Sequence, residues 1–266
     1  MSTDKTAEIS KVPQGLEDLV TFDRPTGSDT GTLGSEGIGR DDILMPRIAV
    51  AQKMSPEIDP THAKFIKDLQ FTDLFHTLTR KNLGKGPLHF CILRRDEPRW
   101  IEFNPIDEGG GIKDKDVRKG DPRTEFHGDE KPVATEFHDY IVLLLTGMDL
   151  ADPMASIVGL SLKSTGIRAA KHLNLLVQMR GPKLICKGVY ALTTGHETDK
   201  KTQGTYATYK FQNAGWLKPD SQVEKLAVEL FKVWKDRKVE FERDNPDDFE
   251  PMKYEAAVAG GARTDM

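Results

Sequence analysis

The feature that most constrains the fold is a series of short apolar segments with strand character, interrupted late in the chain by one amphipathic helix. Residues 136–146 form the strongest predicted strand, and residues 88–94 alternate with a two-residue period. Residues 164–180 carry apolar side chains at helical spacing and stop at Gly181-Pro182. Further strands are expected at 43–52, 100–103, 157–162, 184–194 and 204–213.

The order of these elements favours an α+β fold that is mostly antiparallel β. A helix inserted late into an antiparallel series of strands is what an OB-like Greek-key barrel requires. We expect Ser164 or Thr165 to cap this inserted helix. A C-terminal helix, capped by Asp220 or Ser221, carries an apolar stripe to about Phe241. The order leaves one alternative open, an antiparallel α+β sheet that does not close into a barrel.

Composition along the chain predicts one core with flexible ends. Residues 1–41 are rich in Ser, Thr, Asp and Gly without sustained periodicity, and they are interpreted as a flexible N-terminal arm. The core is expected at 42–217, and the Gly- and charge-rich stretch 107–131 is interpreted as a mobile loop within it. The C-terminal helix is expected at 218–244, followed by a flexible acidic tail at 245–266.

The apolar segments are too short for membrane spans, and the cysteines are few. No stretch approaches the roughly 18 apolar residues that a transmembrane helix needs, and the N-terminus lacks the apolar region of a secretory signal. Cys91 and Cys186 sit in apolar runs far apart in the sequence, which indicates reduced core cysteines. The sequence therefore predicts a cytoplasmic protein that binds no membrane.

Charge is distributed unevenly around a formal net charge of -4. Residues 161–210 contain nine basic residues and two acidic ones, and residues 60–95 are also basic. The ends have the opposite sign, because residues 1–42 and 236–266 each contain nine acids against four and five bases. A polyanion is the simplest ligand for such a basic middle.

Aromatic residues interleave with this charge in the last predicted hairpin. Tyr206 and Lys210 share one face of a strand and Tyr209 and Phe211 the other, so only one of these pairs can face solvent. Single-strand binders need this mixture, because bases stack on aromatic rings while cations neutralise phosphates. We predict a nucleic-acid-binding set of phosphate contacts and stacking residues: Arg94, Arg95, Arg99, Trp100, Lys163, Arg168, Lys171, Lys187, Tyr190, Tyr206, Tyr209, Lys210 and Trp216.

No motif in the sequence indicates catalysis, a cofactor or a metal. The seven histidines are dispersed and form neither an HExxH pair nor a zinc set with the two cysteines. Gly84-Lys85-Gly86 lacks the rest of a phosphate-binding loop, and His138-Asp139 is a neighbour pair without a third partner. The sequence therefore predicts a protein that is not an enzyme.

Several short motifs resemble a group of bacteriophage single-stranded-DNA-binding proteins of OB-type fold. They are the segment 41–59 (DDILMPRIAVAQKMSPEID), Arg99-Trp100-Ile101-Glu102, the Leu160–Thr165 element before the helix, and Gly215-Trp216. The similarity covers roughly residues 41–216. It implies a non-catalytic protein of the host cytoplasm that coats and protects single strands during DNA replication or recombination.

The resemblance also implies partners, and it leaves alternatives open. Phage single-strand binders often use an acidic tail to recruit replication or recombination proteins. Here the acidic stretch 244–250 is internal to the C-terminal segment, which departs from that pattern. A virion structural or assembly protein is the alternative function, and a nucleic-acid-processing enzyme is a third. A homo-oligomer is compatible with each of these interpretations.

Overall fold

The computed structural model describes residues 45–235 apart from 106–109, 129–130, 182–183 and 200–202. The chain divides into two units, Met1–Ile43 and Leu44–Met266, and every described residue belongs to the second unit. The predicted N-terminal arm, the acidic tail and the end of the C-terminal helix lie outside the described residues.

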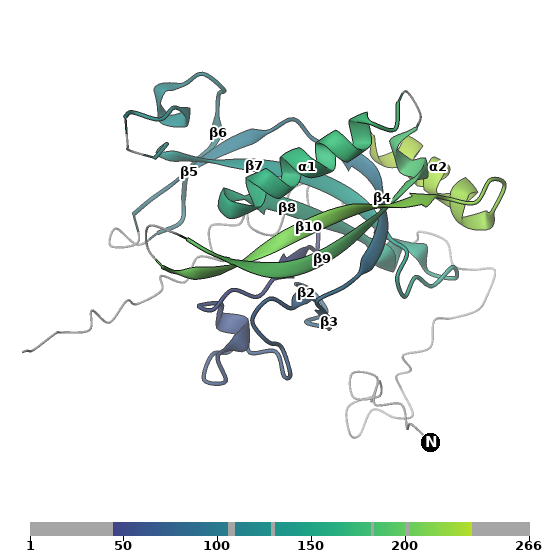
Figure 1. The fold of residues 1–266 in the computed structure, drawn as a ribbon, viewed down its shortest axis with the longest axis horizontal. Helices are drawn as coiled ribbons and strands as arrows, with labels where there is room; N and C mark the ends of the chain where they lie inside the picture. Colours follow the sequence, from purple (N-terminus) through teal and green to yellow (C-terminus); the bar gives the residue numbers. More distant parts are fainter. Residues whose placement is uncertain (1–44, 106–109, 129–130, 182–183, 200–202, 236–266) are drawn as a thin grey trace, which may run out of the picture. The chain divides into compact units, whose positions relative to one another are not determined.

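Within the described part of the chain, the main sheet has seven strands and is antiparallel throughout (Figure 1). Its order is β10-β9-β4-β7-β5-β6, and β8 pairs with the other edge of β7. The strands are β4 (Leu88–Arg95), β5 (Arg99–Phe103), β6 (Ile112–Val117), β7 (Ala134–Leu144), β8 (Ile157–Lys163), β9 (Gly188–Thr198) and β10 (Thr205–Trp216).

A small second sheet is formed by β1 (Ile48–Val50), β2 (Leu74–His76) and β3 (Asn82–Gly84). The sequence predicted a longer first strand at 43–52 and did not predict β2 or β3, each of which has only three residues.

The segment around β1 lies between β8 and β10, two of the edge strands of the main sheet. Arg47 forms a parallel bridge with Gly159 on β8, and the Gly159 amide donates to the Pro46 carbonyl (2.7 Å). On the other side, the Gln52 carboxamide accepts from the Ala207 amide (2.8 Å) and donates to the Ala207 carbonyl (3.2 Å). A side chain, not a ladder of backbone bonds, thus connects this segment to β10. The α+β, mostly antiparallel class is confirmed, whereas the sheets are not closed into a barrel.

Two hydrophobic cores lie on opposite faces of the sheet. Helix α1 (Ile167–Gln178) contributes Ala170 and Leu173 to the core that contains Phe90 and Tyr140. Helix α2 (Gln222–Trp234) contributes Ala227, Leu230 and Trp234 to the core that contains both cysteines. Cys91 and Cys186 are free and fully buried, as predicted, and burial raises the pKa of Cys91 to about 12.

The two helices begin differently. Ser221 caps α2 as predicted, since its hydroxyl accepts a hydrogen bond from the Glu224 amide (3.2 Å). The predicted cap of α1 is wrong: a 3₁₀ turn (Ser164–Gly166) joins β8 to α1, and Gly166 occupies the cap position without a side-chain hydrogen bond. Neither helix of the described residues is long and apolar enough to cross a membrane.

The predicted mobile loop at 107–131 contains ordered structure. It holds β6, which pairs with β5, and a 3₁₀ turn at Pro122–Thr124; we call β5, β6 and this turn the β5–β6 arm. Arg123 ties the arm together through ion pairs with Glu102 (2.6 Å), Asp114 (3.0 Å) and Asp121 (2.9 Å). Hydrogen bonds from Arg123 lower the pKa of Asp121 to about 2. Residues 106–109 and 129–130 lie outside the described residues.

We expect Arg123→Gln to loosen the arm without disturbing the core. Because one guanidinium serves three carboxylates, its loss leaves the nearly buried Glu102 with Lys113 as its remaining ion-pair partner among the described residues. Hydrogen exchange should show at least tenfold lower protection in β6 and unchanged protection in β4 and β7. Arg118→Gln, at an exposed position of the same arm, is the matched control. Equal protection of β6 in both variants would show that the Arg123 network does not order the arm.

Candidate nucleic-acid interface

One face of α1 is exposed along its whole length. Its side chains recur every three or four residues, as on one side of a helix. No Asp or Glu occurs between residues 153 and 196. The positive charge of α1 is therefore not offset by an acidic residue of the helix or of the segments that adjoin it in the sequence. The first half of the face is basic and the second half uncharged; the exposed residues are Arg168, Lys171, His172, Leu175, Gln178 and, directly after the helix, Met179.

The start of α1 lies among further cations and aromatic rings. Lys163 closes β8 directly before the 3₁₀ turn, and its ammonium nitrogen lies 5.6 Å from the ring centre of Phe137 and 5.7 Å from that of Phe103. Half-buried Tyr206 donates from its hydroxyl to Glu197 (3.3 Å). Burial and Glu197 raise the pKa of Tyr206, whereas nearby Arg168 lowers it.

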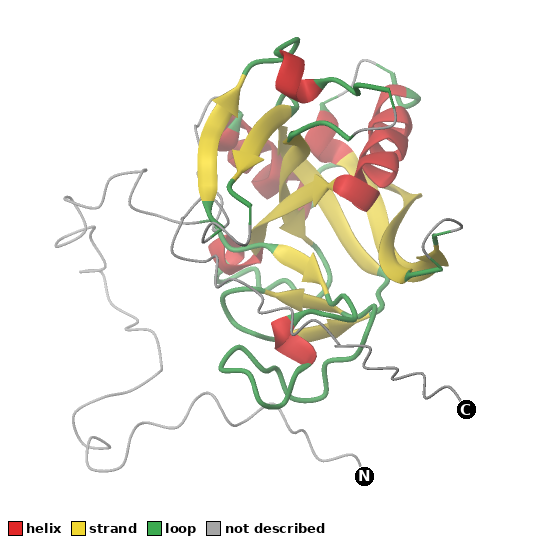
Figure 2. Cartoon of the chain, turned by 90° about the vertical axis from the view of Figure 1, so that its left-hand side faces the viewer, coloured by secondary structure: helices red, strands yellow, loops and turns green. Residues whose placement is uncertain are grey.

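The β5–β6 arm and the free end of the β9–β10 hairpin lie on the same side of the molecule as the start of α1 (Figure 1). Seen from that side, the arm is on the left and the hairpin end on the right, with strands of the main sheet between them (Figure 2). The basic start of α1 is therefore flanked by two projecting hairpins.

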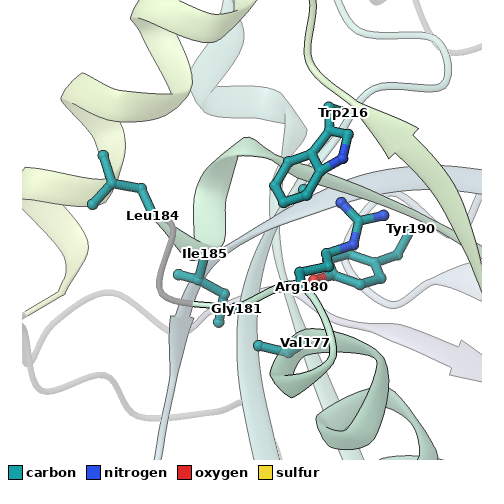
Figure 3. Close-up of a pocket in the computed structure, with 8 residues that line it drawn as sticks. Val177, Arg180, Gly181, Leu184, Ile185, Tyr190 and Trp216 are labelled. Carbon is teal, nitrogen blue, oxygen red and sulfur yellow. The ribbon is translucent and has the colours of Figure 1, made fainter.

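The other end of α1 carries an aromatic stack. The Arg180 guanidinium carbon lies 4.4 Å from the ring centre of Trp216 and 4.6 Å from that of Tyr190 (Figure 3). Trp216 is 45% exposed, whereas Tyr190 is 1% exposed. The hollow beside the stack has a volume of about 30 Å³, which admits water and no nucleobase. A ligand at this end would therefore bind on the surface and not in a pocket.

Three of the predicted phosphate contacts are engaged in ion pairs. Arg94 pairs with Asp96 (2.5 Å), and Arg99 pairs with Asp139 (2.6 Å), whose side chain is 1% exposed. Lys187 pairs with Glu224 of α2 (2.9 Å), and this contact raises the pKa of Lys187 and lowers that of Glu224. The Arg94 contact is local, the Arg99 contact joins β5 to β7, and the Lys187 contact holds α2.

The predicted aromatic residues differ in how far they are exposed to solvent. The prediction that Tyr190 stacks on a base is wrong, because its ring lies in the core. On β10, Phe211 is buried and Lys210 exposed, so the face with Tyr206 and Lys210 is the one toward solvent. Tyr209 packs half-buried against the core below α1, and Trp100 is half-buried in β5.

Four predicted cations are exposed and form no ion pair with a described residue: Arg95, Arg168, Lys171 and Lys210. Of the predicted site residues, Arg168 and Lys171 on α1, Lys163 before it and Trp216 at its far end form the set that we call the α1 surface, whereas Tyr206 and Lys210 lie on the other face of β10. Arg180 was not among the predicted site residues. Its contact with Trp216 joins the end of a helix to the end of a strand 36 positions later, and no local pattern indicates it.

No group of three or more His, Cys, Asp or Glu side chains within the described ranges is arranged to hold a metal ion. The nearest approach to a catalytic pair is His138, whose ring lies 2.9 Å from Glu136. The α1 surface offers exposed cations and the half-exposed indole of Trp216 to a ligand.

Comparison with known proteins places the chain in a phage family. A family model described as Pam3 phage gp34-like protein matches residues 21–240. The chain belongs to this family. The match to the Pam3 phage gp34-like family spans every residue of the α1 surface. Searches of curated proteins and of solved structures found no match.

Membership of the Pam3 phage gp34-like family confirms the phage character that the short sequence motifs indicated. A single-strand binder and a virion protein are both phage proteins, so the family alone does not choose between these functions.

We expect Lys187→Met to act on α2 and not on binding to single strands. The substitution removes the ion pair with Glu224, so thermal melting should occur at a slightly lower temperature. Fluorescence anisotropy with a labelled single-stranded oligonucleotide should give an affinity within twofold of the unmodified protein. Lys171→Met, at an exposed position of α1 without a described ion pair, is the control; it should lower the affinity for the single strand and leave the melting temperature nearly unchanged. Equal losses of affinity in both variants would return Lys187 to the binding set.

Proposed function

We propose that this protein binds single-stranded DNA without catalysis and coats strands during phage replication or recombination. The observation that carries the proposal is the exposed face of α1. Arg168 and Lys171 stand there without acidic partners among the described residues, and an exposed tryptophan lies at the far end of the same helix. A single strand requires these two elements, cations for its phosphates and an aromatic ring for its bases.

The dimensions of α1 suit an extended strand. A helix rises 1.5 Å per residue, so α1 extends about 15 Å from Arg168 to its last residue, Gln178. A strand that follows the helix would have its phosphates near Lys163, Arg168 and Lys171 and a base near Trp216. Duplex DNA keeps its bases stacked on one another, so it should bind less tightly.

The connectivity supports an OB-like core. The antiparallel order β8-β7-β4-β9-β10, with α1 between β8 and β9, corresponds to the five-stranded OB arrangement with its inserted helix. In that arrangement the loop between the first two strands and the loop between the last two flank the ligand. Here the β5–β6 arm and the end of the β9–β10 hairpin occupy these positions (Figure 2). Contact with replication or recombination proteins through the acidic C-terminal segment stays a prediction.

The double substitution Arg168→Gln with Lys171→Gln tests the proposal. Both side chains are exposed, so thermal melting should be nearly unchanged. Affinity for a labelled single strand should fall at least tenfold, which is about 1.4 kcal/mol. The slope of log affinity against log salt should lose about 1.4 in magnitude, because each phosphate contact contributes about 0.7.

The matched control is Lys225→Gln with Lys232→Gln, which removes two exposed lysines from α2. This control should bind like the unmodified protein. If both double variants lose affinity equally, binding follows net charge and not the α1 surface. If the unmodified protein binds no single strand, a virion role becomes the better interpretation, and magnesium-dependent cleavage of the oligonucleotide would indicate an enzyme.

A further inference from the structure

A β-bulge determines where Trp216 points. On β10, Asn213 pairs with Tyr190 and Gly215 pairs with the adjacent Val189, so Ala214 is an extra residue in the strand. Side chains alternate along a strand, and one extra residue moves all later side chains to the opposite face. Trp216 is thereby moved from the face of Lys210 to the face that α1 covers. Gly215 has a φ of +108°, a backbone conformation that glycine accommodates without strain.

Arg180 fills the space that the bulge creates. Its guanidinium group lies between the rings of Trp216 and Tyr190 (Figure 3). Gly188 pairs with Trp216 across the two strands. The guanidinium fits here because Gly188 has no side chain: a Cβ atom at this position would lie 2.6 Å from Nη1 of Arg180. A glycine, a bulge and an arginine from three parts of the chain thus fit together around one indole.

The hydrogen bonds of Arg180 go to the bulge itself. Nη1 donates to the Gly215 carbonyl (2.6 Å), and Nη2 donates to the Val189 carbonyl (2.9 Å) and to the side-chain oxygen of Asn213. The same Asn213 oxygen accepts from the Gly215 amide (2.9 Å). Among the described residues no carboxylate pairs with Arg180, and burial lowers the pKa of its guanidinium. The guanidinium of Arg180 therefore donates its hydrogen bonds to β9 and β10 and stacks on the rings of Tyr190 and Trp216.

This arrangement does not bury the tryptophan. Trp216 remains 45% exposed at a hollow that exposed Leu184 also lines, although a fixed cation, a glycine and a bulge determine its position. Fixing an exposed aromatic ring before a ligand arrives reduces the entropy that binding must offset. An exposed indole can stack on any of the four bases, because every base has a π-face.

We propose that Arg180 is a positioning residue, which holds the Trp216 indole as the stacking site for one unpaired nucleobase. The inference rests on the proposed function. It adds that Arg180 contacts no phosphate, and that the strand is held by charge at the start of α1 and by stacking at its end.

The test compares affinity, salt dependence and tryptophan fluorescence for binding to an oligothymidylate. Arg180→Met and Trp216→Leu should each weaken binding about tenfold and leave the salt slope unchanged, because neither removes a phosphate contact. Each should also abolish the component of fluorescence quenching that Trp216 contributes. The double variant should bind no worse than either single variant, since both remove the same interaction.

Conservative variants separate positioning from charge. Trp216→Phe keeps a ring and should restore most of the affinity, while Arg180→Lys keeps the charge but lacks the planar fork that reaches the three acceptors from two nitrogens and stacks between the rings, so it should resemble Arg180→Met. Trp216→Leu alters a half-exposed side chain, so the test does not depend on how well the Arg180 variants fold. Arg168→Gln is the control, and it should lower the salt slope by about 0.7 while the quenching persists.

Two results would overturn the inference while the proposed function stands. One is full affinity and full quenching in Trp216→Leu and Arg180→Met, with Arg168→Gln still weakened. The other is full rescue by Arg180→Lys together with a smaller salt slope in Arg180→Met, which would make Arg180 a phosphate contact. A complete absence of anisotropy change with the unmodified protein would overturn the proposed function, and this inference with it.

Discussion

The structure depends on the burial of β7 on both of its faces. Tyr140 and Val142 point into the core covered by α1, while Ile141 and Leu143 point into the core covered by α2. The same strand pairs with β4 and β5 along one edge and with β8 along the other. Near-continuous apolar sequence in β7 follows from this position, since neither face meets water. Each helix is therefore required to cover one face of the same sheet.

Two covered faces restrict where a ligand can bind. Residues at the centre of β4 and β7 are not available, so accessible charge and aromatic surface lies on the outer side of α1 and at the strand ends. Arg168 and Lys171 meet this condition on the helix, and Trp216 meets it at the end of β10. The proposed path of single-stranded DNA along α1 is thus a consequence of how the core is built.

Local patterns predicted most strands of the main sheet and both helices, but not β2, β3 or β6, and long-range contacts determined the rest. The strand at 157–162, the two helices and the Ser221 cap follow from periodicity and capping within a few residues. Residues 107–131, which contain β6, are interpreted from the sequence as a loop because they are rich in charge, and the ion pairs of Arg123 that tie them to β5 are not visible in a local pattern. Basic residues could be found in the sequence, but their acidic partners could not: Arg99 meets Asp139, which lies 40 residues away. The position of Trp216 depends on a bulge that alternation alone does not reveal.

The most direct test of the central claim is a salt titration of single-strand binding. Affinity for a labelled oligothymidylate and for a duplex of equal length would be measured by anisotropy at several salt concentrations. The account predicts tighter binding of the single strand and a log-log slope steeper than about -2, as expected when at least three phosphates are neutralised at about 0.7 each. A flat salt dependence, or tighter binding of the duplex, would contradict it.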